Sequence, residues 1–155
     1  QLQRTYPDIN VVDKDRIFSV EADIFAPCAM GAVLNDATIP LLKAGIVAGA
    51  ANNQLAKDEH DKMLADHDIL YAPDYITNAG GLIRVAYEYF ARTGRQPFAT
   101  PITYNSMMAH TAGIGTTLEN IFQLARDLRR PTGQIADKQA EAIFRAPQDK
   151  PSAAE

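Results

Sequence analysis

Three short stretches of this sequence combine very small residues with neutral polar side chains. In one of them, Gly49, Ala50 and Ala51 lead directly into the two amides Asn52 and Asn53. Small residues let a flat ligand approach the backbone closely, and an amide offers one acceptor and two donors, which suits another amide. A ring that carries a carboxamide is therefore a reasonable ligand for this stretch, because Asn can hold it without adding charge.

Two further stretches have the same character, namely Pro27-Cys28-Ala29 and Thr77-Asn78-Ala79-Gly80-Gly81. Asn and Gly also favour turns and helix caps, so each stretch by itself is explained at least as well by local structure. Asn53, for example, could serve only as a helix cap. The occurrence of three such stretches weakens the local explanation and favours a shared ligand site.

Short apolar runs precede all three stretches and predict buried strands of a parallel sheet. Helix-like segments at 36–44 and 57–67 separate these runs, and this alternation predicts an α/β fold with right-handed crossovers. In open α/β sheets, ligands bind at the carboxyl ends of the strands, where the three stretches lie. The predicted strands are Ile24-Phe25-Ala26, Ile46-Val47-Ala48 and Ile69-Leu70-Tyr71-Ala72, with residues 9–12 as an earlier candidate.

Helical periodicity replaces this alternation after Gly81. The spacing of apolar residues predicts a helix over 82–92, for which Gly94 and Pro97 are stop signals. A longer helix is predicted from about residue 103 to residue 128, with an apolar stripe along one face.

A last helix is predicted over 134–145, after Pro131 ends the previous one, and Thr132 or Gly133 could cap it. Residues 146–155 are low in apolar content and are predicted to be disordered. We therefore expect a parallel sheet of three or four strands, followed by C-terminal helices that pack elsewhere.

The charge and composition of the chain limit its partners. The formal net charge is −4, so the charge balance gives no reason to expect nucleic-acid binding. No apolar run approaches the roughly 20 residues that a membrane span needs. The lone cysteine, Cys28, excludes an intrachain disulfide and agrees with a cytoplasmic location. The chain starts without Met and near a strand-like segment, which suggests a fragment of a longer protein.

Several other signals are better explained by structure than by chemistry. The stretch GIGTTL from Gly113 resembles a dinucleotide-binding glycine motif, but it lies in a helical pattern and not after a strand. His60 and His67 have no third ligand in suitable spacing, so a solvated helix face is favoured over a metal site. Cys28 is favoured as a small buried residue over a nucleophile, and Asp74 as a partner in loop hydrogen bonds over an acid catalyst.

A family resemblance lies in three segments: DIFAPCAMGAVLND from Asp23, IVAGAANNQL from Ile46 and YAPDYITNAGGLIRVA from Tyr71. They resemble the C-terminal half of the leucine/phenylalanine/valine dehydrogenases, which belong to the wider glutamate dehydrogenase superfamily. The resemblance is specific from about Val12 to Tyr89 and weaker as far as about Arg145. It implies NAD-dependent oxidative deamination of an L-amino acid to its 2-oxo acid and ammonia.

The resemblance also implies roles for particular residues. Asn52 would hold the nicotinamide end of NAD, and Asn78 would stand at the boundary between cofactor and substrate. Leu82 and Val85 would line the pocket for the substrate side chain, and their apolar nature favours a branched or aromatic substrate over glutamate. Each of these two taken alone is equally well explained as core. The implied cofactor-binding residues are Pro27, Cys28, Ala29, Ala50, Ala51, Asn52 and Asn78.

The same resemblance implies that the site is incomplete. Neither the catalytic lysines of the family, in their glycine-rich context, nor its cofactor-binding glycine loop occurs in this sequence. We therefore expect no catalytic residue here, and an inactive chain that needs a missing N-terminal domain or a companion chain. The expected organisation is a partial Rossmann-like NAD-binding domain at 1–90, a helical segment at 91–145 and the tail at 146–155.

Two alternatives remain open from the sequence. The chain could be a stand-alone, non-catalytic module that binds a partner protein through the surface its missing half would cover. It could also belong to a dehydrogenase for an unusual aromatic amino acid, because the sequence does not distinguish such a substrate from leucine or phenylalanine. A homo-oligomer in the cytoplasm is expected in the enzyme interpretation.

Overall fold

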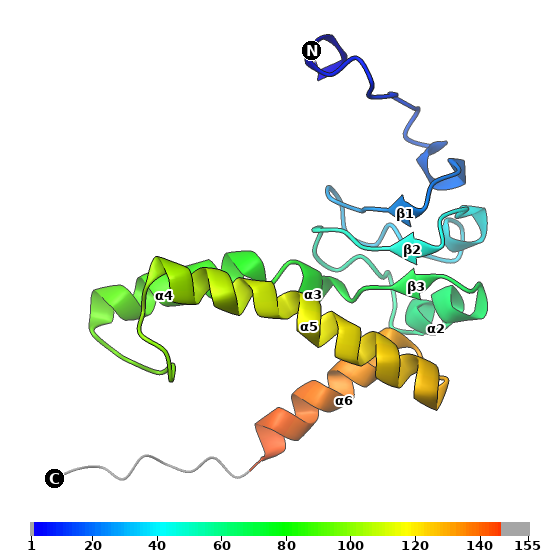
Figure 1. Cartoon of the computed structure of the whole chain (residues 1–155). Coiled ribbons are helices and arrows are strands. Elements are labelled where there is room, and N and C mark those ends of the chain that lie inside the picture. The colour runs from blue at the N-terminus through cyan, green and yellow to red at the C-terminus, as the bar shows by residue number, and fades with distance from the viewer. Residues whose placement is uncertain (1, 147–155) are drawn as a thin grey trace, which may run out of the picture.

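Three short parallel strands form the sheet in the computed structural model, which describes residues 2–146. The strands are β1 (Ile24–Phe25), β2 (Ile46–Val47) and β3 (Leu70–Tyr71), and they lie in the order β1-β2-β3 (Figure 1). Ile24 pairs with Ile46, and Ile46 pairs with Leu70, so the register follows the apolar runs. The sheet and its helices confirm the prediction of an α/β, partial Rossmann-like fold.

Residues 9–12 do not form the additional strand that their apolar content predicted. They follow the short helix α1 (Leu2–Thr5) and precede a 3-10 turn, η1 (Ile17–Ser19), in a segment that runs away from the sheet (Figure 1). Val11 is exposed. A strand needs a neighbour for its backbone N–H and C=O groups, and among the described residues β1 pairs with β2 alone.

The connections between the strands are less helical than predicted. The segment 36–44 contains only the 3-10 turn η2 (Ile39–Leu41), which has Pro40 within it. The next connection contains α2 (Glu59–Asp66), close to its predicted range. The turn η2 ends at Leu42, whose backbone is extended, with φ −63° and ψ 132°, so the first connection does not continue into an α-helix.

The main hydrophobic core lies between the sheet and these connections. Six side chains form it, and all are almost completely buried. Residues from all three predicted strand–helix units contribute, so each unit needs the others to bury its apolar face. The members are Leu34, Ile39, Val47, Leu64, Ile69 and Tyr71.

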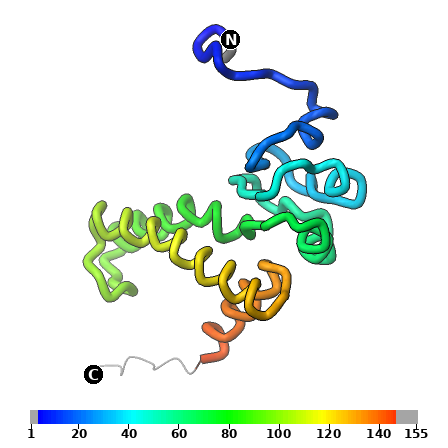
Figure 2. Tube along the Cα trace, turned by 45° about the vertical axis from the view of Figure 1, so that its right-hand side comes forward, coloured from blue at the N-terminus to red at the C-terminus, as the bar shows by residue number. Residues whose placement is uncertain are grey.

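Four helices follow the sheet: α3 (Asp74–Thr77), α4 (Gly80–Thr93), α5 (Tyr104–Leu128) and α6 (Thr132–Arg145). In both views α4 and α5 lie side by side and project beyond the sheet (Figures 1 and 2). Gly94 ends α4 in the left-handed conformation, with φ 67°, as its position in the sequence predicted. None of the helices among residues 2–146 is both long and apolar enough to cross a membrane.

The ends of α5 agree with the sequence prediction. Thr103 caps its first turn by accepting a hydrogen bond from the Ser106 backbone N–H at 3.1 Å. The GIGTTL stretch from Gly113 lies inside this helix, so it is no dinucleotide-binding turn. Ile121 and Ala125 of α5 pack against Ile135 and Ala136 of α6 in a second core.

The start of α6 was predicted incorrectly. Pro131 occupies the cap position, and neither Thr132 nor Gly133 does. Thr132 instead donates its hydroxyl hydrogen to the backbone oxygen of Tyr71, 2.6 Å away, which ties α6 to the end of β3. Of the predicted tail at 146–155, all but Ala146 lies outside the described residues.

A carboxylate from α2 performs the capping of α6. Asp61 Oδ2 accepts a hydrogen bond from the Gln134 backbone N–H at 3.1 Å, although the two residues are far apart in sequence. Asp61 is buried, and burial raises the pKa of its carboxyl group above the usual value. Nearby, the Tyr75 hydroxyl donates to Asp137 Oδ1 at 2.7 Å, so two contacts fix the first turns of α6.

Candidate functional site

The loops that follow the three strands lie together at one edge of the sheet, beside α3 (Figure 1). The Ala51 backbone N–H donates to the Pro27 oxygen at 2.9 Å, which joins the loops after β1 and β2. A Cβ added to Gly49 would lie 2.2 Å from that same Pro27 oxygen, so only glycine allows the two backbones to approach this closely. Small residues were predicted here because they leave space for a ligand. They also allow the loop after β2 to pack closely against the loop after β1.

Asn52 and Asn78, the two amides expected to hold a cofactor, are in direct contact. Asn78 Nδ2 donates a hydrogen bond to Asn52 Oδ1 at 2.6 Å. Asn52 is exposed and Asn78 is half-buried. Within residues 2–146, no partner is found for Asn52 Nδ2 or Asn78 Oδ1, so the pair presents one free donor and one free acceptor. These are the two groups that a carboxamide requires.

Gln54, which the sequence analysis did not single out, fixes the loop that carries Asn52. It is fully buried, and its Nε2 donates to the Gly49 oxygen at 2.9 Å and to the Ala51 oxygen at 3.0 Å. Its backbone N–H donates to Asp74 Oδ2 at 3.1 Å. Its place in the sequence could have indicated its role, because Gln54 directly precedes the apolar Leu55, and a polar residue that faces the core needs hydrogen-bond partners there.

Asp74 takes part in loop hydrogen bonding, as predicted. Its Oδ1 accepts from the Tyr75 backbone N–H at 2.9 Å, while its Oδ2 accepts from Gln54. The Asp74 backbone N–H donates to the Tyr71 hydroxyl at 3.3 Å. Burial, together with the neighbouring carboxylate, raises the pKa of Tyr71, so this phenol stays protonated.

The other predicted cofactor-binding residues divide by exposure. Pro27 and Ala51 are buried in the contact between loops, whereas Ala29 and Ala50 are exposed. Cys28 is exposed as well, so the interpretation of this residue as a buried structural cysteine is wrong. An exposed cysteine does not fill the core.

Leu82 and Val85 lie on a face of α4 that no described element covers. Leu82 is 74% exposed and Val85 is 60% exposed. The interpretation of these two residues as ordinary core is therefore wrong. The buried side of α4 instead includes Tyr87, whose ring stacks on Phe98 with a centroid distance of 4.6 Å. Two large apolar side chains follow Asn78 on an open surface.

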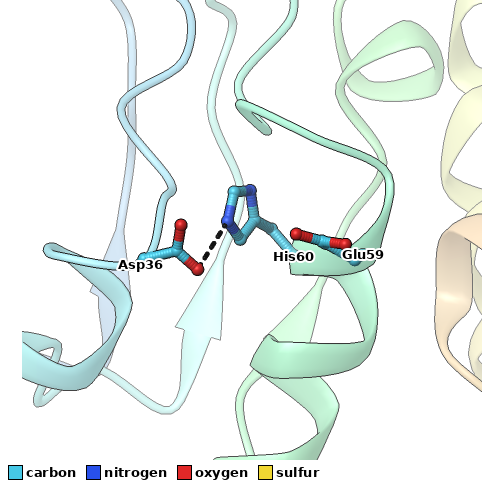
Figure 3. A group of neighbouring side chains, drawn as sticks. All are labelled: Asp36, Glu59 and His60. Carbon is cyan, nitrogen blue, oxygen red and sulfur yellow. Dashed lines mark ion pairs between the residues drawn. The ribbon is translucent and has the colours of Figure 1, made fainter.

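A second polar cluster contains Asp36, Glu59 and His60 (Figure 3). Their potential ligand atoms lie within 4.8 Å of one another, a spacing compatible with a metal ion. His67 is exposed, as predicted, but the prediction of a solvated face is wrong for His60, which is only 1% exposed.

The hydrogen bonds of this cluster favour an ion pair over a metal centre. The Lys57 backbone N–H donates to His60 Nδ1 at 3.0 Å, which places the proton of the neutral ring on Nε2. Nε2 then carries a hydrogen and not a free lone pair, and it lies 3.3 Å from Asp36 Oδ1 (Figure 3).

The Lys57 ammonium group lies between the two carboxylates that a metal ion would need, 3.1 Å from Glu59 Oε1 and 3.6 Å from Asp36 Oδ2. The hydrogen bond from His60, together with the charge of Lys57, lowers the pKa of the Asp36 carboxyl group. The positive charge of Lys57 thus already neutralises these carboxylates, in the way that a metal ion would.

Comparison with known proteins identifies the family. The sequence profile described as Glutamate/Leucine/Phenylalanine/Valine dehydrogenase matches residues 2–137. The chain belongs to this family. The match extends well past the three strand-end motifs and includes α4, α5 and the start of α6.

Curated relatives within the dehydrogenase family show the same similarity. Leucine dehydrogenase from Thermoactinomyces intermedius is 43% identical over 130 residues, which cover 84% of this chain and 33% of the relative. Phenylalanine dehydrogenase from Bacillus thermotolerans is 46% identical over 142 residues, covering 92% of this chain and 35% of the relative. The chain therefore spans about a third of the length of the curated relatives it matches.

Solved dehydrogenase structures share the fold. The crystal structure of L-tryptophan dehydrogenase from Nostoc punctiforme matches with a TM-score of 0.77 at 41% identity, over 90% of this chain and 39% of that one. Glutamate dehydrogenase from Peptoniphilus asaccharolyticus matches with a TM-score of 0.54 at 22% identity, over 80% of this chain and 32% of that one. The second likeness concerns the fold alone.

Proposed function

We propose that this chain is the C-terminal part of an NAD-dependent L-amino-acid dehydrogenase and supplies the nicotinamide side of its cofactor site. The observation that carries this proposal is the Asn52–Asn78 pair at the joined strand ends, with one free donor and one free acceptor. In this proposal residues 1–90 are the partial NAD-binding domain and residues 91–145 the helical segment. The names of the relatives support the reaction class.

The residues present fit a carboxamide-bearing cofactor. Asn52 Nδ2 is available to donate to a carboxamide oxygen, and Asn78 Oδ1 to accept from its nitrogen, so both polar groups of the ligand find a partner. The exposed small residues Ala29 and Ala50 leave room beside the amide pair for a flat ring. Pro27, Cys28 and Ala51 belong to the same joined loops and complete the proposed nicotinamide wall.

The substrate is proposed to be a branched-chain or aromatic L-amino acid. Leu82 and Val85 follow Asn78 on an open apolar face of α4, where they can contact an apolar side chain once a second wall closes the pocket. Glutamate would place a carboxylate against this face, which is unfavourable without a partner charge. Relatives named for leucine, phenylalanine and tryptophan support this substrate class.

The role of this chain in the reaction is positioning. NAD supplies the hydride acceptor when it is bound. Asn52 and Asn78 orient the carboxamide and thereby the face of the ring that meets the substrate, which reduces the entropy cost of hydride transfer. The groups that move protons are proposed to lie on the rest of the polypeptide or on a companion chain, within a cytoplasmic homo-oligomer. The chain by itself is therefore proposed to be inactive.

The Asn52→Ala variant of the intact polypeptide tests the proposed cofactor contact. Loss of the amide removes a donor to the cofactor, so the KM for NAD in amino-acid oxidation should rise by about tenfold, as for one lost hydrogen bond in a desolvated site. Asn53→Gly is the matched control, since Asn53 has a positive φ of 53° that glycine also adopts. Unchanged kinetics in Asn52→Ala would remove Asn52 from the site.

The alternative of a stand-alone module that binds a protein partner is not favoured by the comparisons, because the relatives are amino-acid dehydrogenases. The mass of the native protein distinguishes the two. A polypeptide much longer than 155 residues supports the enzyme, and a native product of this length supports the module.

A further inference from the structure

Gln54 lies beneath the loop of residues 49–53 and is fully buried, so it cannot touch a ligand. We propose that Gln54 is a positioning residue, which holds this loop in the one conformation that presents Asn52 to the nicotinamide carboxamide. This inference rests on the proposed function and names a residue that acts through Asn52. It assigns to the buried amide a part in cofactor orientation, beyond the packing of the core.

The side chain of Gln54 closes the loop from inside. Both of its donor hydrogens go to loop carbonyl groups, at 2.9 Å to Gly49 and at 3.0 Å to Ala51. These two carbonyl groups belong to the residues on either side of Ala50, and the second directly precedes Asn52. The distance between the ends of this turn is therefore set by a single planar amide, which has little freedom to stretch.

Contacts from neighbouring elements hold the same loop from outside. The Thr77 hydroxyl donates to the Gly49 oxygen at 2.9 Å, and the Gln54 backbone N–H donates to Asp74 Oδ2 at 3.1 Å. On the other side, the Ala51 backbone N–H donates to the Pro27 oxygen. The loop is thus fixed at once against α3 and against the segment that follows β1, which is the support that a precise binding side chain needs.

The hydrogen bonds of Gln54 serve the loop more fully than they satisfy its own side chain. Gln54 Oε1 is buried and finds no hydrogen-bond donor within residues 2–146. A buried acceptor without a donor costs folding free energy, but an apolar residue in this place would remove the donors to two backbone carbonyl groups. The amide donates two hydrogen bonds, to the Gly49 and Ala51 carbonyl groups. These bonds fix the conformation of the loop directly before Asn52.

The test measures cofactor binding to the intact polypeptide by isothermal titration calorimetry, with NADH and with ADP-ribose, which lacks the nicotinamide. The variant Gln54→Met keeps the length of the side chain but loses both donors. It should weaken NADH binding by about tenfold, the size expected for a misplaced hydrogen bond, and leave ADP-ribose binding within about twofold. Gln134→Met, on the exposed side of α6, is the control and should change neither affinity.

Two outcomes overturn the inference alone, provided that Asn52→Ala selectively weakens NADH binding. They are an unchanged NADH affinity in Gln54→Met, and an equal loss of affinity for NADH and ADP-ribose. If Asn52→Ala leaves NADH binding unchanged, both the inference and the proposed function fall. Should Gln54→Met not fold, Thr77→Val removes one bond to the same Gly49 oxygen. It should show the same selective loss for NADH, and its absence would contradict the inference.

Discussion

At the scale of single residues, the candidate site depends on how closely two loops approach each other. Gly49 has no room for a side chain, because an added Cβ would lie 2.2 Å from the Pro27 oxygen and 2.5 Å from the Pro27 nitrogen. Both are backbone atoms, so neither can rotate away. The position of Asn52 therefore depends on a residue that contributes no functional group of its own.

Gly49→Ala should destabilise the chain by roughly 1–3 kcal/mol, the usual cost of overpacking a tight contact. The free energy of unfolding, measured by urea denaturation, checks this value. Gly45→Ala is the matched control, since no atom lies within 4 Å of a Cβ built at that position. If the two variants had equal stability, the close contact between the loops would be wrong.

Sequence reasoning proposed Asn52 and Asn78 as site residues because an amide after a buried strand is visible in the residue order, and the structure brings the two side chains into contact. It missed Gln54, because the importance of this residue comes from two carbonyl groups that are brought together only in the folded loop. A helix-capping role had been left open for Asn53, yet α2 begins at Glu59, and Asn53 has a positive φ. Local propensity did not distinguish a cap from a turn.

At the scale of elements, α6 is held by residues that come from other parts of the fold. Asp61 of α2 caps its first turn, and Thr132 bonds to the end of β3. The strands were predictable from compact apolar runs, but the start of α6 was not, because its cap lies in another helix. Residues 9–12 show the converse error, an apolar run that has no neighbouring strand among the described residues.

The pH dependence of folding tests the capping by Asp61. Burial raises the pKa of this carboxyl group above its value in the unfolded chain, so the unfolded chain loses the proton first as pH rises. Its contribution to stability is complete below the unfolded pKa of about 3.9 and falls through the folded pKa, by up to about 1.4 kcal/mol per pH unit.

Asp61→Asn should remove this decline, because asparagine keeps an acceptor for the Gln134 N–H and does not ionise. Urea unfolding of wild type and variant across the acidic range provides the measurement. Gln134→Ala leaves the backbone N–H in place and should keep the decline of the wild type. The same decline in Asp61→Asn would show that another group causes it.

At the scale of the whole molecule, the described residues expose an apolar helix face and a sheet edge, which agrees with the proposal that the chain is one part of a longer enzyme. Leu82, Val85 and Tyr89 form an open apolar face of α4, and β1 has an unpaired edge within the described residues. The chain spans about a third of the length of its curated relatives. The proposed cofactor site thus has one wall here, which is why the isolated chain is expected to be inactive.

The central claim is tested most directly by initial rates of NADH formation from NAD by the intact polypeptide, across a panel of L-amino acids. We predict turnover of a branched-chain or aromatic amino acid, a much lower rate with glutamate, and none with the isolated 155-residue chain. A preference for glutamate would contradict the apolar pocket at Leu82 and Val85. Absence of NAD-dependent turnover with every amino acid would contradict the proposed function itself.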